Sequence, residues 1–155
     1  MESFAVISDC GHYRYRLGRT WGVGDHIAFI MLNPSTADAI ADDATIRRCI
    51  GFGQRAGYQG LLVGNLFAWR ATKPSELRAA GDPVGPSNDA ALIEIISDSR
   101  LIVCAWGTNV FGGRDLMVLD MIRSRGRVPH CLRLTMNGHP GHPLYVPAAM
   151  RPIPF

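Results

Sequence analysis

Polar residues suited to a catalytic or binding pocket follow the apolar stretches of this sequence. Asn33 follows the apolar residues 27–32, and Asn65 lies near the end of the apolar stretch 61–66. A loop near the end of the sequence carries His139 and His142. Amides hold water and match hydrogen-bonding edges, and histidine exchanges a proton near neutral pH. These residue types predict acid–base or hydrogen-bonding chemistry on a polar substrate.

Acidic, basic and aromatic side chains complete the set. Asp38, Asp42 and Asp43 follow Asn33 closely and are candidate general bases, although Asp43 is also placed to cap a helix. Of the sixteen basic residues only Lys73 is a lysine, and the arginine fork suits phosphate, whereas a codon bias explains the same excess equally well. An alternative to a functional role is that Asn33 and Asn65 are only the turn residues that end their strands. Phe67, Trp69 and Trp106 suit base stacking, and core or rim packing is the alternative for the two tryptophans.

The elements that must position these residues alternate between strands and helices. Residues 27–32 form an unbroken apolar run ended by Asn33-Pro34, which is typical of a strand buried on both faces. The sequence predicts a three-layer α/β/α fold with a central, mostly parallel four-stranded sheet and an N-terminal β-hairpin at one edge. The predicted strands are residues 4–7, 13–17, 27–32, 61–66, 101–106 and 131–135, and the predicted helices follow Asp43, follow Ser87 to Asp89, and span 113–124.

This arrangement predicts one cleft. In open parallel sheets, ligands bind at the carboxyl ends of the strands, and Asn33, Asn65, Thr108, Asn109 and the histidine loop all follow such ends. The long, turn-rich segment 67–86 is typical of a functional or disordered loop. The helix after Asp43 is expected to face the core with Ile46, and the helix 113–124 with Leu116, Leu119 and Ile122.

Length and composition indicate a single domain over residues 1–155. No apolar run approaches the roughly 20 residues of a membrane span, and the N-terminus lacks a basic leader, so we expect a cytoplasmic protein with no membrane partner. The four cysteines are widely spaced, which argues against zinc and iron–sulfur ligation. Nucleotide-binding glycine fingerprints are absent, and His139 and His142 flank a Pro-Gly turn rather than a helix. The sequence predicts no cofactor and no metal.

Several motifs together resemble a known bacterial family. MLNPSTADA, DDATIRRC, GNLFAWRAT, DPVGPSND, AWG and LTMNGHPGHPLY are similar to domain of unknown function 1643, over residues 13 to 147. The layout also resembles the uracil-DNA glycosylase superfamily, in which an Asn-Pro type motif, a strand ending in asparagine and a final His-Pro loop occur in this order. The cysteines that hold an iron–sulfur cluster in some branches are missing here.

The second resemblance implies roles for individual residues. Asn33 resembles the residue that positions water, Asn65 the residue that recognises the base, and His139-Pro140 the loop that stabilises the departing base, with His142 the alternative histidine. Asp43 or Asp38 is the candidate activator of the water. The expected catalytic residues are Asn33, Asp43, His139 and His142, and the expected substrate-binding residues are Pro34, Ser35, Asn65, Phe67, Arg47, Arg70 and Leu144.

Three functions remain open at this point. The first is an N-glycosidic hydrolase acting on a base in DNA or RNA, or on a modified nucleoside or nucleotide. The second is a non-catalytic nucleotide- or nucleic-acid-binding module with the same fold. The third is a pocket-bearing interaction protein with no nucleic-acid role. A net charge of only +3 is modest for a protein that grips duplex DNA through many phosphates.

Overall fold

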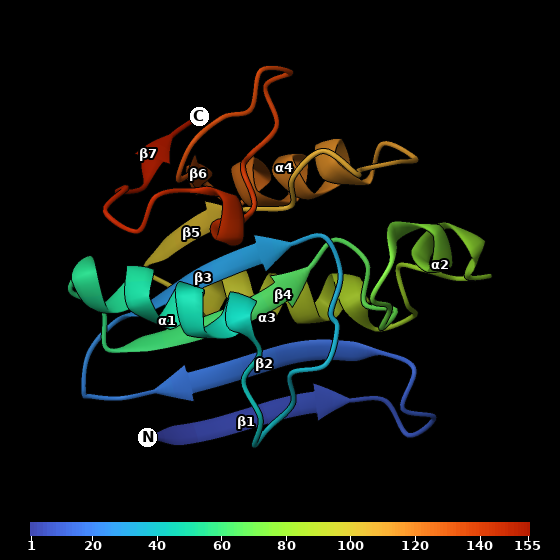
Figure 1. Ribbon diagram of the computed structural model, residues 1–155, viewed down its shortest axis with the longest axis horizontal. Helices are drawn as coiled ribbons and strands as arrows, with labels where there is room; N and C mark the ends of the chain where they lie inside the picture. Colours follow the sequence, from blue (N-terminus) through green and yellow to red (C-terminus); the bar gives the residue numbers. More distant parts are fainter.

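The computed structural model describes residues 1–155 as a mixed α/β fold built on one seven-stranded sheet. Across the sheet the strand order is β1-β2-β4-β3-β5-β6-β7, so the chain starts at one edge and ends at the other (Figure 1). The strands are β1 (Glu2–Ile7), β2 (Arg14–Thr20), β3 (His26–Met31), β4 (Gly60–Asn65), β5 (Leu101–Cys104), β6 (His130–Cys131) and β7 (Ile153–Pro154). The helices are α1 (Ala44–Arg55), α2 (Pro74–Ala79), α3 (Asn88–Asp98) and α4 (Arg114–Ser124), with a 3-10 turn η1 (Pro143–Tyr145).

The sheet is larger than the four strands predicted from the sequence. Strands β4, β3, β5 and β6 are parallel neighbours. The predicted hairpin forms β1 and β2, and β2 extends the sheet because it pairs directly with β4, antiparallel. The two-residue strand β7 pairs antiparallel with β6 at the opposite edge. Two residues give no periodicity from which a strand can be predicted.

The apolar stretches that predict buried strands are confirmed within two residues at each end. Every residue of β4 is buried, as is every residue of β3 after His26. Apart from His26 at the start of β3 and Asn65 at the end of β4, both strands are free of polar side chains, because helices cover both faces of the sheet and leave no solvated face for alternating polar residues. The predicted helix cap is also confirmed: Asp43 accepts a hydrogen bond from the Ile46 N–H at 2.9 Å at the start of α1.

Two predictions about the C-terminal half are wrong. The strand predicted over 131–135 ends at Cys131, because after the buried Leu132 the chain leaves the sheet and Leu134, 43% exposed, forms only an isolated bridge with Pro140. Leu116, predicted to face the core from α4, is 66% exposed. The buried stripe of α4 runs instead through Val118, Leu119 and Ile122.

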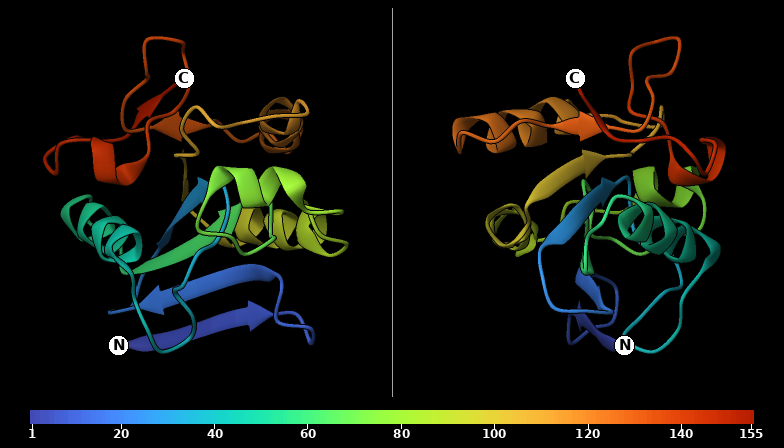
Figure 2. Two further views of the ribbon diagram at one scale, coloured as in Figure 1. Left: turned by 45° about the vertical axis from the view of Figure 1, so that its right-hand side comes forward. Right: turned by 90° about the vertical axis from the view of Figure 1, so that its left-hand side faces the viewer.

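The core has two layers, one on each face of the sheet. Figure 2 shows α1 and η1 on one side and α2, α3 and α4 on the other. Phe29, Ile46 and Phe52 belong to the layer under α1, whereas Leu92, Ile102 and Ile122 belong to the layer under α3 and α4. The two layers hold the central strands from both sides and fix the positions of their carboxyl ends. No helix is both long enough and apolar enough to cross a bilayer.

Candidate functional site

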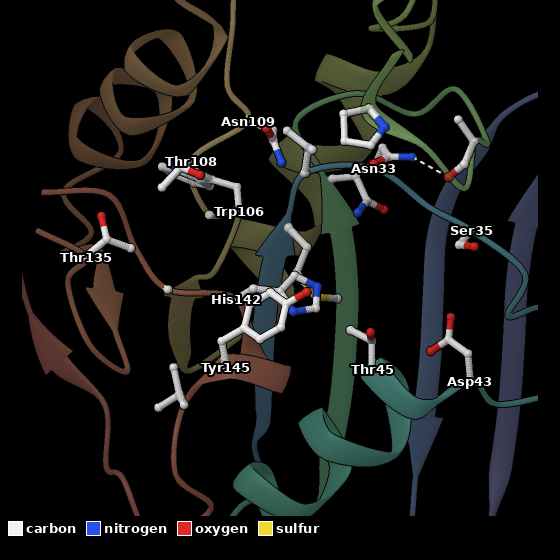
Figure 3. A pocket seen from close by; sticks show the side chains of 18 of the residues that line it. Asn33, Ser35, Asp43, Thr45, Trp106, Thr108, Asn109, Thr135, His142 and Tyr145 are labelled. Atoms are coloured by element: carbon white, nitrogen blue, oxygen red, sulfur yellow. Dashed lines mark hydrogen bonds between the residues drawn. The ribbon is translucent and has the colours of Figure 1, made fainter. Parts of the chain in front are cut away.

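A pocket of about 660 Å³ lies at the carboxyl ends of the central strands. Its walls come from the loop after β3, the first turn of α1, the end of β4, the loop after β5 and the segment 133–146. In the view of Figure 3, Asp43 and Thr45 lie on one side of the pocket and His142 with Tyr145 on the other. The volume lies within the range of small-molecule sites.

Asn33 is fixed at the pocket wall by its own amide group. Its Nδ2 donates to the carbonyl oxygen of Ala71 at 2.8 Å (Figure 3). The same nitrogen donates to the carbonyl oxygen of Pro34 at 3.1 Å. Two backbone carbonyls accept from the same nitrogen, so the orientation of the amide is defined. Its Oδ1 accepts no hydrogen bond from the protein and is left as an acceptor for water or ligand.

Asn65 lines the same pocket from the last position of β4, where it is only 2% exposed. Its side-chain Nδ2 is buried and has no hydrogen-bond partner. The backbone around it is held firmly, because the carbonyl oxygen of Asn65 accepts from Asn88 Nδ2 at 3.0 Å and that of Leu66 accepts from Arg114 Nε at 2.8 Å. A buried side-chain amide without a protein partner, on a backbone that is held in place, is suited to a ligand that supplies hydrogen-bonding groups.

Asp43 has two tasks, capping α1 and lining the pocket. The preceding loop is anchored by Arg19 of β2, whose side chain is 1% exposed. Arg19 pairs with Asp42 at 2.9 Å and donates to the carbonyl oxygens of Asp38 and Ala41. This buried anchor fixes the loop that delivers Asp43 to the pocket.

His142 is the histidine that faces the pocket. Its Nδ1 accepts a hydrogen bond from the Leu144 N–H at 3.2 Å, and its ring lies 5.5 Å from that of Tyr145. Burial lowers the pKa of His142, and the negative charge of Asp43 opposes this shift. A neutral ring that accepts at Nδ1 carries its proton on Nε2, so His142 is a hydrogen-bond donor.

The other expected site residues divide between the pocket and its surroundings. Ser35 lines the pocket. Arg70 does not line it, and its Nε donates to the carbonyl oxygen of Ser35 at 3.4 Å. Pro34 is buried, and its carbonyl oxygen accepts from the backbone N–H of Ala71. Arg47, His139 and Leu144 do not line the pocket.

Phe67 and Asp38 make contacts within the protein and do not line the pocket. Phe67 is 2% exposed and stacks on Phe111 in the core, with ring centroids 4.4 Å apart. Asp38 accepts from the backbone N–H groups of Ile40 and Ala41, and these hydrogen bonds lower the pKa of Asp38.

Sequence reasoning missed Arg14. It begins β2, lines the pocket and is only 3% exposed, and burial lowers its pKa to about 10. No local signal in the sequence marks Arg14, because its burial follows from the antiparallel pairing of β2 with β4, and an arginine beside alternating residues is expected to face solvent. Trp106, expected to stack or pack, is buried with Nε1 unpartnered at the pocket wall.

The structure contains no cluster of three or more histidine, cysteine or acidic side chains arranged to hold a metal ion. Cys49, Cys104 and Cys131 are buried free thiols, and Cys10 is exposed. Burial raises the pKa of each of the three buried thiols, which keeps them protonated and unreactive at neutral pH.

Comparison with protein families gives one match. A family model described as a protein of unknown function, DUF1643, matches residues 14–144. No curated protein and no solved structure matches the chain.

Proposed function

The chain belongs to the DUF1643 family, whose description names no activity, and we propose from its pocket that it is an N-glycosidic hydrolase. In this proposal a single cytoplasmic domain with a uracil-DNA glycosylase-like layout releases a base from nucleic acid or from a modified nucleotide. The observation that carries the proposal is that Asn33, Asn65, Asp43 and His142 line one pocket although they come from four separate segments.

The chemistry requires an acceptor that holds water and a donor that meets the leaving base. Asn33 Oδ1 holds the water, and Asp43 takes a proton from it as the water oxygen bonds to the anomeric carbon. The bond between that carbon and the base nitrogen breaks, and its electron pair leaves with the base. His142 donates a hydrogen bond from Nε2 to the base as negative charge develops there. The base regains a proton on release, which leaves a hydroxyl on the sugar.

Asn65 is the residue proposed to recognise the base. Its Nδ2 is buried without a protein partner. An amide side chain pairs this donor with a carbonyl acceptor, which matches a base edge that presents one acceptor and one donor. If the substrate is polymeric, the base has to leave its stack to reach the pocket.

A second candidate is a non-catalytic module that binds a nucleotide or nucleic acid in the same pocket. It is favoured by the fact that the two residues assigned to the water also have structural partners: Asn33 donates to Ala71 and Pro34, and Asp43 caps α1. Residues with structural roles need no catalytic role to explain their presence.

A base-release assay separates the two candidates. Wild type and Asn33→Ala are incubated with single- and double-stranded oligonucleotides and free nucleotides that carry uracil or other modified bases, with detection by mass. Release by wild type that falls at least about 100-fold in the variant supports the hydrolase. Saturable binding without release, retained in Asn33→Ala, supports the module and rejects the hydrolase.

A further inference from the structure

Arg14 differs from the other buried arginines of this protein. Arg14, Arg19 and Arg114 are all at most 3% exposed. Arg19 pairs with Asp42 at 2.9 Å and Arg114 pairs with Asp89 at 2.6 Å. A buried guanidinium remains charged at neutral pH, and leaving it without an opposite charge is costly. Arg14 alone among the three has no carboxylate within ion-pair distance, so its counter-charge has to come from elsewhere.

The hydrogen-bonding pattern of Arg14 indicates where that counter-charge binds. Its Nη1 donates to the carbonyl oxygen of Ala37 at 3.0 Å, whereas its Nε is buried and unpartnered. Nη2 makes no hydrogen bond either, so neither nitrogen of the Nε–Nη2 edge has a partner in the protein. This edge of a guanidinium grips a carboxylate or phosphate with two parallel hydrogen bonds. Asp43 acts on Arg14 at longer range but is held as the cap of α1.

Two further unpartnered donors lie in the same pocket. Asn65 Nδ2 and Trp106 Nε1 are buried without a hydrogen-bond partner, and both residues line the pocket with Arg14. The occupant therefore presents acceptor atoms to several donors and carries an anionic group that pairs with Arg14. A base with carbonyl or ring-nitrogen acceptors, joined through a sugar to a phosphate, has this distribution of groups.

We infer that the pocket binds a nucleoside 5′-monophosphate as a free molecule, with its phosphate paired to the Nε–Nη2 edge of Arg14. The terminal phosphate of a mononucleotide can enter a buried site, whereas the backbone phosphates of a polymer lie on its outside and are gripped by exposed cations. The inference rests on the proposed function, because it assigns the substrate class of the same pocket.

The test measures affinity for each nucleoside 5′-monophosphate against its own nucleoside, for uridine, cytidine, adenosine and guanosine, by calorimetry. We expect wild type to prefer at least one monophosphate by about 10- to 100-fold. Arg14→Met should reduce this preference to near unity, and Arg14→Lys, which keeps the charge but lacks the fork, should reduce it partly. Arg123→Met, which removes an exposed arginine on α4, is the matched control and should leave the preference unchanged.

Three results would overturn the inference: equal affinity of wild type for monophosphate and nucleoside, a preference that Arg14→Met leaves intact, or binding of oligonucleotides with none of monophosphates. The wild-type comparison decides even if Arg14→Met does not fold. Failure of the hydrolase proposal is separate, because it would show as Arg14-dependent nucleotide binding without base release. Base release with no preference for the phosphate would instead reject the inference alone.

Discussion

The backbone N–H of Leu144 donates a hydrogen bond to Nδ1 of His142 at 3.2 Å. This contact closes the first turn of η1, for which His142 is the cap. It is available only while Nδ1 is unprotonated, so the local backbone structure and the burial of the ring both favour neutral imidazole. The residue proposed to meet the leaving base is therefore also a group whose protonation is linked to folding.

The stability of the protein is expected to fall as pH is lowered through the titration of His142. Burial holds the folded-state pKa below the unfolded value of 6.5, so the unfolded state binds the proton more readily. The stabilisation is full above pH 6.5 and is lost as pH falls through the lowered folded-state pKa. Urea unfolding from pH 8 to 5, compared between wild type and His142→Asn, measures it. Parallel free-energy curves for the two proteins would contradict this linkage.

Removing the Asn33 amide should reduce both activity and stability. Asn33→Ala loses the hydrogen bonds to Ala71 and Pro34, and we expect the free energy of unfolding to fall by about 1–2 kcal/mol. In the proposed reaction Asn33 holds the water, so base release should fall by at least about 100-fold in this variant. Ile122→Val, in the core layer under α4, is the control: it should cost about 1 kcal/mol and leave release unchanged. Equal loss of release in both variants would assign the effect to stability alone.

Arg19, which anchors the loop before Asp43, should contribute more to the free energy of unfolding than Arg16 on the same strand, because the carboxylate partners of Arg16 are exposed. Arg19→Met leaves Asp42 and several loop carbonyls without their donor, and we expect a loss of about 3 kcal/mol in the free energy of unfolding. Arg16 pairs with Glu94 and Asp98, whose side chains are 61% and 59% exposed. Arg16→Met should therefore cost at most about 1 kcal/mol. Similar losses in urea unfolding would show that the loop is held by other contacts.

The sequence predicts the strands that reach the pocket better than it predicts the pocket itself. β3 and β4 were identifiable because burial on both faces demands continuous apolar residues, and Asn33 and Asn65 mark their ends. Asp43 was identifiable as a cap because capping is a local interaction. Arg14 was not, because its burial depends on the pairing of β2 with β4, which brings together segments distant in sequence.

Which of the two histidines faces the pocket also depends on the folded structure and not on local sequence. His139 and His142 lie three positions apart in one loop, and the sequence gives no basis for preferring either. The structure differentiates them through the turn η1, which places His142 at the pocket while His139 does not line it. Phe67 shows why the role of an aromatic residue is hard to predict from sequence, since phenylalanine is equally suited to stacking on a base and to packing in a core.

Phe67 should affect stability and not ligand affinity. It stacks on Phe111 in the core and does not line the pocket. Phe67→Leu is expected to lower the free energy of unfolding by about 1 kcal/mol, because the smaller side chain loses aromatic contacts. Its affinity for nucleoside monophosphates, measured by calorimetry, should stay within about twofold of wild type, because substitutions away from a binding site have small effects. A tenfold loss of affinity would restore the stacking role that the sequence suggested.

The capping of α1 by Asp43 and its proposed role in taking a proton from water can be separated by one isosteric substitution. Asparagine caps a helix about as well as aspartate, so Asp43→Asn should keep the free energy of unfolding within about 0.5 kcal/mol of wild type. It lacks the charge needed to take a proton from water, so base release should fall by about 100-fold or more. Asp43→Ala loses both functions and should also be destabilised by about 1 kcal/mol. Base release by Asp43→Asn at the wild-type rate would leave Asp43 with the capping task only, and the water would then need no carboxylate to activate it.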